Sequence, residues 1–413
     1  MSKIELASKQ TETRVKQDDS SLKKYKRNIN LLHVLSFLMG VHFFGAVMIA
    51  FFEGWGGMTF TQIMLLESIF TGAIFLFEIP TGTIADKFGR KLSLNLGNAI
   101  NTVAVLVYIA YPNFWILALG EIIWALAVAL NSGAYEALVY DSLLELGREK
   151  ESKKIYSRVR SLSLGGMVMG TIAGGFIAST WGAWSTMALS AIPLALAALL
   201  GMFLVEPTQH EQSKKDSPWQ IFQKGLKTIR KNKGLKRIIM DSIILSVIAY
   251  YSVWLWQSRL MALGVNMAYF GLIHASMVII QILLLNMIQP LEKLLGSKKG
   301  LVVFTGVGMG VGFVLFGITD NVAFVILGIL LAAGLGMSRR TFMTNYMQKH
   351  IDSGQRATTL STVSMMQKFL LMVINPLIGY LTEYSITGVL LGLGVLAILW
   401  SLFTPVKESY LED

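Results

Sequence analysis

Two carboxylates, Glu67 and Glu78, lie within one apolar stretch of the sequence, and either could accept and release a proton. They are eleven residues apart, about three turns of an α-helix, so a helix would place them on one face. Carboxylates inside an apolar helix are costly and usually face a helix-bundle interior or a water-filled cavity. We consider Glu67 as a proton carrier or, equally, a structural hydrogen-bonding residue. For Glu78 a structural role is favoured.

A lysine and a histidine also lie inside apolar stretches. Lys368 is about midway along its stretch and is the deepest charge in the sequence, where an unpaired ammonium group is costly. The sequence does not identify its partner, and we interpret Lys368 as a functional candidate. His42 could join a proton route because histidine titrates near neutral pH, although hydrogen-bonded packing is the more common role.

A further polar and aromatic set could line a binding pocket. Its members are Glu121, Asn131, Tyr251, Trp254 and Arg259. The aromatic residues are interpreted as an interfacial belt, which is slightly favoured, or as the wall of a pocket for an amphipathic organic molecule. Arg259 needs a carboxylate partner inside the apolar region. The candidates are Glu53, Glu67 and Glu121.

The stretches that carry these residues are long enough to cross a bilayer. Of 413 residues, 54% are hydrophobic and 15% charged, against about 25% charged in soluble globular proteins. A spanning helix needs about 20 apolar residues, which disfavours a large soluble protein with buried helices. Twelve spans are predicted, at 31–52, 60–81, 92–111, 114–138, 162–181, 184–204, 238–262, 267–289, 300–319, 322–343, 357–381 and 385–404. We expect an all-α membrane protein.

The basic residues predict the orientation of these spans. All but two of the 36 lysines and arginines lie on one side, in the termini, in alternate loops or, for Arg339 and Arg340, at the end of span ten. The exceptions are Arg259 and Lys368. Cytoplasmic loops carry an excess of such residues. We therefore expect both termini to be cytoplasmic and the protein to lie in the plasma membrane. The net charge of +11 could indicate a nucleic-acid partner, but this distribution of the basic residues does not favour one.

A long polar loop divides the spans into two sets of six. Arg158-x-x-x-Leu162-Ser163 opens span five, and Arg356-x-x-x-Leu360-Ser361 opens span eleven, which indicates an internal repeat. The predicted organisation is a tail 1–30, a bundle 31–205, a linker 206–237, a bundle 238–405 and a tail 406–413. Two parallel halves around a central cavity are typical of transporters.

The segment Gly82–Lys91 is predicted to be a tight, charged hairpin at the membrane surface, because its two glycines permit a sharp turn. It resembles the pattern G-x-L-A-D-R-x-G-R-K between helices 2 and 3 of the major facilitator superfamily. The residues in register are Gly82, Ala85, Asp86, Gly89, Arg90 and Lys91. The preceding Glu78-Ile79-Pro80-Thr81-Gly82 resembles the E-x-P-T-G run of a subset of that superfamily. The resemblance covers about residues 30–405 and implies two pseudo-symmetric six-helix bundles.

The resemblance also implies a conformational latch. In the family pattern, the aspartate meets the start of helix 11, and an arginine reaches an acid at the end of helix 4. Carried over, Asp86 would face the helix start at Arg356. Arg90 would pair with Asp141 or, less favourably, Glu136. Such pairs would hold one conformation and break in the other. Alternatively, the basic residues of this segment only fix the topology.

A glycine-rich run lies in span five. It reads Gly165-Gly166-x-x-x-Gly170-Thr171-x-x-Gly174-Gly175. Small residues at this spacing permit close helix packing. We expect that role for Gly166, Gly170, Gly174 and Gly175. The run resembles the G-x-x-x-G-P-x-x-G-G antiporter motif of drug-efflux members, although Thr171 replaces the proline.

No nucleotide-binding loop, zinc-ligand cluster or nucleophile motif is apparent, so we expect neither an enzyme nor a bound cofactor or metal. The favoured function is proton-coupled export of an amphipathic organic compound by a monomeric, drug-efflux-like transporter. One alternative is a proton symporter or uniporter for a polar nutrient. Others are a non-transporting sensor and a lipid flippase of the same fold.

Overall fold

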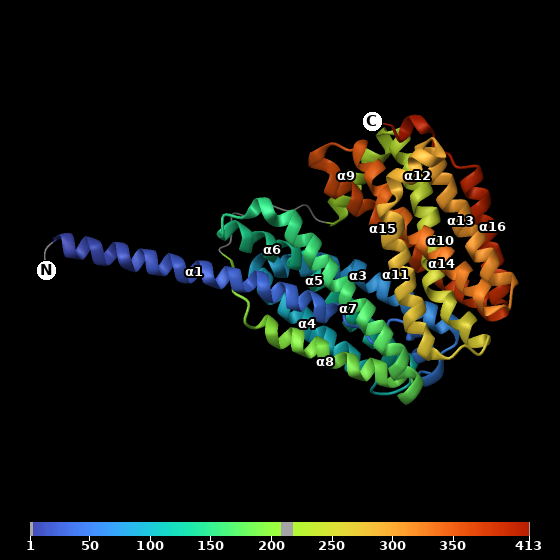
Figure 1. Cartoon of the computed structure of the whole chain (residues 1–413), viewed down its shortest axis with the longest axis horizontal. Coiled ribbons are helices and arrows are strands. Elements are labelled where there is room, and N and C mark those ends of the chain that lie inside the picture. The colour runs from blue at the N-terminus through green and yellow to red at the C-terminus, as the bar shows by residue number, and fades with distance from the viewer. Residues whose placement is uncertain (1–2, 208–217, 413) are drawn as a thin grey trace.

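The computed structural model describes the backbone of residues 3–207 and 218–412, and the side chains from Leu22 onward except those of 79–80, 82–87 and 208–218. Every regular element in the described ranges is helical, so the predicted all-α fold is confirmed. The helices form two bundles, and the N-terminal part of α1 projects away from them (Figure 1).

The first bundle contains α1 to α8. Its elements are α1 (Lys3–Gly40), α2 (Met48–Ala50) with the π-helical turn η1 (Phe51–Trp55), α3 (Phe60–Phe88), α4 (Arg90–Tyr108), α5 (Phe114–Asn131), α6 (Ala134–Glu145), the turn η2 (Glu149–Glu151), α7 (Ser152–Trp181) and α8 (Ala183–Gly201). Span one is interrupted after Gly40, and span four is divided into α5 and α6 at Gly133, whose φ is 74°. This φ lies in the left-handed region of backbone conformation, which glycine adopts without strain.

The linker helix and the second bundle follow. Their elements are α9 (Pro218–Lys231), α10 (Lys233–Ala262), the turn η3 (Met267–Tyr269), α11 (Phe270–Asn286), α12 (Ile288–Leu295), α13 (Lys298–Ile318), α14 (Val322–Lys349), the turn η4 (Ser353–Gln355), α15 (Arg356–Tyr384), α16 (Ile386–Leu402) and the turn η5 (Glu408–Tyr410). The predicted linker 206–237 therefore contains the amphipathic helix α9 and the first turn of α10.

Nine helical segments within the described residues are long and apolar enough to cross a membrane by themselves. The three other predicted spans correspond to interrupted span one, to α4 and to α16, which has only 17 residues. In α4, the polar side chains of Asn95, Asn98 and Asn101 reduce the apolar character. Together these helices account for two bundles of six.

The predicted hairpin at Gly82–Lys91 is wrong in its extent. Helix α3 continues to Phe88, and α4 begins at Arg90, so only Gly89 separates them. Its φ of 101° lies in a region that disfavours any residue with a Cβ. The residues between Gly82 and Gly89 are compatible with a helix, so a single glycine is sufficient to make the turn.

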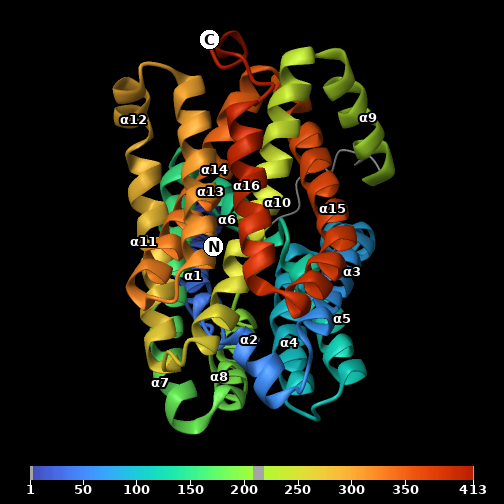
Figure 2. The ribbon, with the colours of Figure 1, turned by 90° about the vertical axis from the view of Figure 1, so that its right-hand side faces the viewer.

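The bundles contact each other at one end of the molecule, where α7 packs on α11 and α3 packs on α15 (Figure 2). Hydrogen bonds join them there, among them one from the amide of Ile49 to Oε1 of Gln257 at 2.9 Å. The amide of Thr61 donates to Glu383 at 2.6 Å, and the hydroxyl of Ser258 donates to Glu53 at 3.1 Å. We call this the closed end. At the opposite, charged end, where α6 and α9 lie, the bundles diverge (Figure 1).

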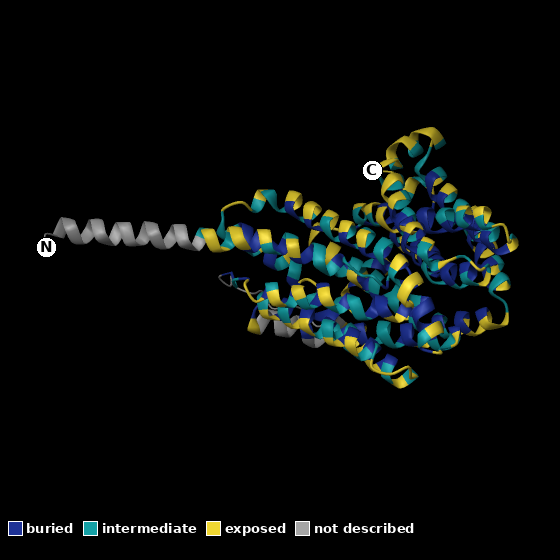
Figure 3. Cartoon of the chain, turned by 60° about the horizontal axis from the view of Figure 1, so that its bottom comes forward, coloured by how far each residue is buried: buried dark blue, intermediate teal, exposed yellow. Residues whose placement is uncertain are grey.

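The outer surface of the bundles is apolar. Figure 3 shows exposed residues along the outer faces of the helices and buried residues between them. Large hydrophobic side chains are among the exposed ones, including Leu76 at 65%, Phe176 at 54% and Val373 at 56%. Exposed apolar area of this extent indicates contact with lipid rather than with water. The chain is therefore a multi-pass membrane protein.

Candidate functional site

A cavity of about 220 Å³ lies between the two bundles. Helices α3 and α5 of the first bundle and α10 of the second contribute most of its wall. The lining residues are Gly45, Met48, Glu67, Phe70, Glu121, Trp124, Val253, Trp254 and Gln257. We call it the central cavity. It combines aromatic walls with two carboxylates and one amide, a composition suited to a molecule with both apolar and polar parts.

Glu67 connects the two bundles inside this cavity. Its side chain belongs to α3, and it accepts a hydrogen bond of 2.9 Å from the hydroxyl of Tyr250 on α10. The residue is only 7% exposed. Glu121 of α5 lines the same cavity and is 2% exposed. The structure therefore places two of the predicted acidic candidates at one site.

The aromatic residues of α10 face the interior. Trp254 lines the central cavity, and Tyr251 is fully buried with its hydroxyl 2.9 Å from Oδ1 of Asn375 on α15. Trp256 is also fully buried. The favoured interpretation as an interfacial belt is wrong for these residues. Their side chains pack against other helices or line the cavity, rather than contacting lipid headgroups.

Two other candidates lie away from the central cavity. The ring of His42 packs at 5.3 Å from that of Phe44, beside the glycine face of α7. Nδ2 of Asn131 donates a 3.4 Å hydrogen bond to Oδ1 of Asn98. Asn131 also lines a separate cavity toward the charged end, together with Glu136. The structure thus divides the predicted proton and substrate residues among several places.

Lys368 and Glu78 form an ion pair between the bundles. Nζ of Lys368 on α15 lies 2.5 Å from Oε1 of Glu78 on α3. Their side chains are 27% and 32% exposed, so the pair borders open space rather than a packed core. The pair gives the deep lysine the partner that the sequence alone did not identify, and it brings two of the predicted candidates together.

Arg259 has a different partner from those expected. Its guanidinium group pairs with Asp320 at 2.7 Å and donates to the carbonyl oxygens of Phe316 and Thr319. The expectation of Glu53, Glu67 or Glu121 is therefore wrong. Asp320 lies in the short connection between α13 and α14, where it is 83% exposed. The arginine reaches out of the membrane region to a loop carboxylate of its own bundle.

One ion pair expected from the predicted latch is present at the charged end. Arg90 forms an ion pair with Asp141 and donates to the carbonyl oxygen of Ala137 at 3.1 Å. Nε of Arg356 lies 3.3 Å from the carbonyl oxygen of Ile351. The side chain of Asp86 and residue Gly82 lie outside the described side chains, so their contact with the start of α15 stays a prediction.

A repeated carboxylate clamp was not foreseen. Both oxygens of Glu206 accept the backbone amides of Arg90 and Lys91, at 2.8 and 2.7 Å, at the start of α4. In the second bundle, Glu408 accepts the amides of Lys298 and Lys299 at the start of α13, at 2.9 and 2.7 Å. Each glutamate follows the sixth helix of its bundle, a position that could have revealed the clamp. A carboxylate there satisfies free amides and complements the helix dipole.

Replacing Glu206 with alanine should loosen the start of α4. Losing both charge-assisted bonds is expected to lower the free energy of unfolding by about 1–3 kcal/mol. Thermal unfolding of the purified protein measures the change. Glu206→Gln, which keeps one carbonyl acceptor, should lose less, and equal loss in both variants would contradict the clamp.

The four glycines of α7 lie at close contacts. A Cβ on Gly170 would lie 2.8 Å from the amide nitrogen of His42, and one on Gly166 or Gly174 would overlap the carbonyl oxygens of Phe37 or Phe43. These three glycines allow α7 to pack on span one of its own bundle. Gly175 differs, because its Cβ would lie 2.9 Å from the amide nitrogen of Gly271 on α11, across the closed end.

The fold and the central cavity define a class: a membrane protein of two six-helix bundles with a binding site at their interface, the architecture of secondary transporters. The model of the major facilitator superfamily matches residues 29–284, and the chain belongs to this superfamily. It is a transport protein rather than an enzyme.

Several relatives share parts of the sequence. An uncharacterized MFS-type transporter, YxaM, from Bacillus subtilis is 27% identical over 52% of this chain and 54% of that protein, so the match spans about half of its length. The class C tetracycline resistance protein of Escherichia coli is 25% identical over 70% of this chain and 73% of that protein. A D-xylose transporter of Levilactobacillus brevis is 30% identical over 35% of this chain and 31% of that protein.

Solved structures show the same fold. A mutant of the nucleoside transporter NupG superposes with a TM-score of 0.78 at 15% identity, covering 91% of this chain and 99% of that chain. A D-xylose–proton symporter superposes with a TM-score of 0.68 at 16% identity, covering 94% of this chain and all of that chain. The predicted major facilitator fold is thereby confirmed.

Proposed function

We propose that this transporter exports an amphipathic organic compound across the plasma membrane in exchange for protons. The charged end faces the cytoplasm, in keeping with the basic residues that gather there. The described conformation then has a closed extracellular end and an open cytoplasmic end. It is one of the two states that alternating access requires, in which one bundle rocks against the other around a fixed site.

The bond between Glu67 and Tyr250 is the observation that carries the proton coupling. An ionised carboxylate accepts a stronger hydrogen bond than a neutral carboxyl group, by roughly twofold. Because the bond joins α3 of one bundle to α10 of the other, the protonation of Glu67 changes the contact between the bundles. A proton bound at this position can thus bias the conformation of the transporter.

The composition of the central cavity supports an amphipathic substrate. Phe70, Trp124 and Trp254 supply apolar walls, while Glu67 and Glu121 supply charge or hydrogen bonding. The relative named as a tetracycline resistance protein supports export. The D-xylose transporter and D-xylose–proton symporter support the alternative of proton-coupled uptake of a polar nutrient. The three aromatic side chains in the cavity wall favour the amphipathic compound.

Glu67→Gln tests the coupling. The amide keeps a hydrogen-bond acceptor for Tyr250 but cannot exchange a proton. We expect transport driven by a pH gradient in proteoliposomes to fall by at least about tenfold, which corresponds to about 1.4 kcal/mol. Binding of the compound to the purified variant should persist.

Glu53→Gln is the matched control, because Glu53 also bridges the bundles through a hydroxyl group but lies at the closed end, outside the cavity. It should keep proton-driven transport. Wild-type coupling in Glu67→Gln would overturn the assignment of Glu67. A panel of candidate compounds, tested for thermal stabilisation of the purified protein, would identify the substrate.

A further inference from the structure

A second cavity, of about 610 Å³, opens on the side of the molecule between α3, α9, α10 and α15. Its wall is almost entirely carbon. The lining residues are Phe75, Trp219, Phe222, Ile243, Met365, Met366, Phe369 and Leu370. We call it the lateral cavity. Its volume lies within the range of about 300–1,000 Å³ that is typical of pockets for drug-sized ligands.

The lateral cavity lies on the seam between the bundles. Phe75 belongs to α3 of the first bundle, while Met366 and Phe369 belong to α15 of the second. Phe75 and Phe369 are 39% and 64% exposed. On the lipid-facing surface of a membrane protein, such exposure connects the cavity with the acyl chains of the bilayer. Methionine side chains adapt to ligands of different shape.

The ion pair of Lys368 and Glu78 lies about one helical turn from residues of the cavity wall. Glu78 lies three residues beyond Phe75 on α3, and Lys368 lies three residues beyond Met365 on α15, so each is on the same helix face as a wall residue. Both side chains are about a quarter to a third exposed, so their charged groups are accessible to a ligand that extends about one turn beyond the cavity wall. An apolar chamber with an ammonium group near its wall has the chemistry that binds an amphipathic anion.

The linker helix α9 forms the wall toward the charged end and lies beside α15 (Figure 2). Trp219 and Phe222 contribute its apolar face, and their rings are stacked at 5.7 Å. The opposite face carries Lys224, Lys227 and Lys231, which line a separate polar cavity. A helix with this division is typical of the membrane interface and attracts anions to the surface. It places the entrance at the level of one leaflet.

We propose that the lateral cavity admits an amphipathic anion directly from the cytoplasmic leaflet, with its apolar part among Phe75, Phe222 and Met366 and its carboxylate or phosphate on Lys368. The anion replaces Glu78 as the partner of Lys368, so the pair that joins the bundles opens when the ligand binds. This inference rests on the proposed function for the direction of access.

The test is a binding measurement that does not depend on transport. The probes are dansyl-labelled undecanoic acid and its uncharged methyl ester, added to the full-length protein in nanodiscs. Energy transfer from Trp219 to the dansyl group reports occupancy, and Trp219→Phe shows how much of the signal comes from this residue. We expect the acid to bind at least about tenfold more tightly than the ester.

Substitutions then locate the site. Lys368→Gln should lower the affinity for the acid by about tenfold and leave the affinity for the ester unchanged. Glu78→Gln should bind the acid at least as tightly as the wild type. Met366→Trp, which fills the cavity, should weaken the binding of both probes. Val373→Trp, on the lipid-facing surface of the same helix, should leave the binding of both unchanged. Met366→Leu supplements Met366→Trp if the larger residue prevents folding, and it should retain binding.

Equal affinity for acid and ester, or unchanged acid binding in Lys368→Gln, would overturn the proposal. Unchanged binding of both probes to Met366→Trp would also overturn it, because the ligand would then lie elsewhere. Glu67→Gln should bind the acid normally. Failure of proton coupling in proteoliposomes would therefore contradict the proposed function without affecting this site.

Discussion

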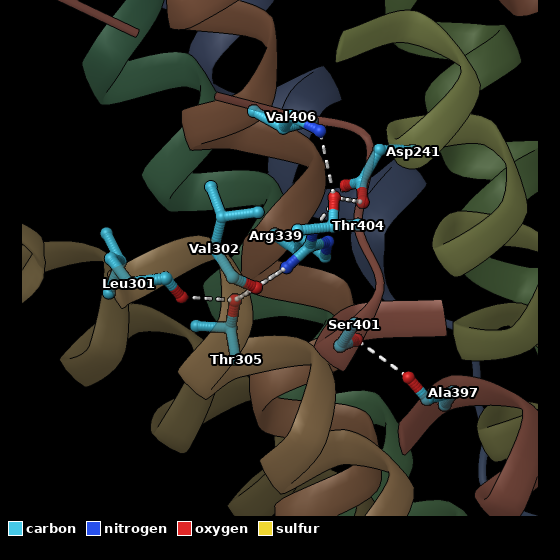
Figure 4. A network of polar contacts seen from close by, with 9 residues as sticks. All are labelled: Asp241, Leu301, Val302, Thr305, Arg339, Ala397, Ser401, Thr404 and Val406. Carbon is cyan, nitrogen blue, oxygen red and sulfur yellow. Dashed lines mark hydrogen bonds and ion pairs between the residues drawn. The ribbon is translucent and has the colours of Figure 1, made fainter. Parts of the chain in front are cut away.

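Replacing Asp241 with alanine is expected to prevent stable folding of the second bundle. Asp241 on α10 is fully buried, forms an ion pair with Arg339 on α14 and accepts a 2.7 Å hydrogen bond from the hydroxyl of Thr404. Arg339 is 1% exposed and also donates to Thr305 at 2.8 Å and to the carbonyl oxygen of Val302 (Figure 4). Without Asp241, the guanidinium group keeps its charge with no carboxylate beside it.

Leaving one member of a buried ion pair without its partner costs about 3–5 kcal/mol, which is a large part of the total stability of a domain. We therefore expect a large fall in the yield of monodisperse Asp241→Ala protein and in its unfolding temperature. Size-exclusion chromatography and thermal unfolding in detergent measure these two quantities.

The matched control replaces both charges, as Asp241→Leu with Arg339→Met. Apolar residues of similar volume often substitute for a buried pair with no loss of stability. The double variant should therefore recover most of the lost stability. If the single and double variants are equally unstable, the charge balance is not the cause, and loss of packing explains the effect.

The amino-acid sequence was sufficient to predict the fold, because the length of an apolar stretch is dictated by the thickness of the bilayer. The same pattern predicted that Glu67 and Glu121 are unusual, since a carboxylate is costly in that environment. It did not predict that both lie in one cavity. That depends on how α3, α5 and α10 pack, which side-chain volumes decide and hydropathy does not.

Charge pairing was the least predictable feature. Arg339 counted with the basic residues at the end of span ten, yet α14 extends past it to Lys349 and buries it beside Asp241. The partner of Arg259 lies outside the apolar stretches, and the partner of Lys368 lies in the other bundle. Each pairing is a contact between distant segments, so no local pattern in one sequence reports it.

Local rules also failed where one residue decided the backbone. The charge and glycine content near Gly82 indicated a loop, yet the helix continues to Phe88 because its residues tolerate helical geometry. Only the positive φ of Gly89 ends it. The glycine spacing of α7 correctly indicated that this helix packs closely on its neighbours. It could not distinguish the three glycines that face span one from Gly175, which faces the other bundle.

Gly175→Leu is expected to prevent the closed end from forming, and with it most transport. A Cβ at this position would lie 2.9–3.0 Å from backbone atoms of Gly271, Ala268 and Met267, and backbone cannot yield as a flexible side chain can. A leucine adds three further carbons. The described conformation should therefore lose stability relative to the state that is open at this end, and transport should fall by about tenfold or more, corresponding to about 1.4 kcal/mol or more.

The lack of native cysteines makes the conformation measurable. A single Val253→Cys in the central cavity, combined with Gly175→Leu, should react faster with an impermeant maleimide added at the closed end than Val253→Cys alone. Gly165→Leu is the matched control on the same helix, because a Cβ there meets open space, and it should change neither reactivity nor transport. Full transport in Gly175→Leu, or equal reactivity in both backgrounds, would show that the contact between α7 and α11 does not control access to the cavity.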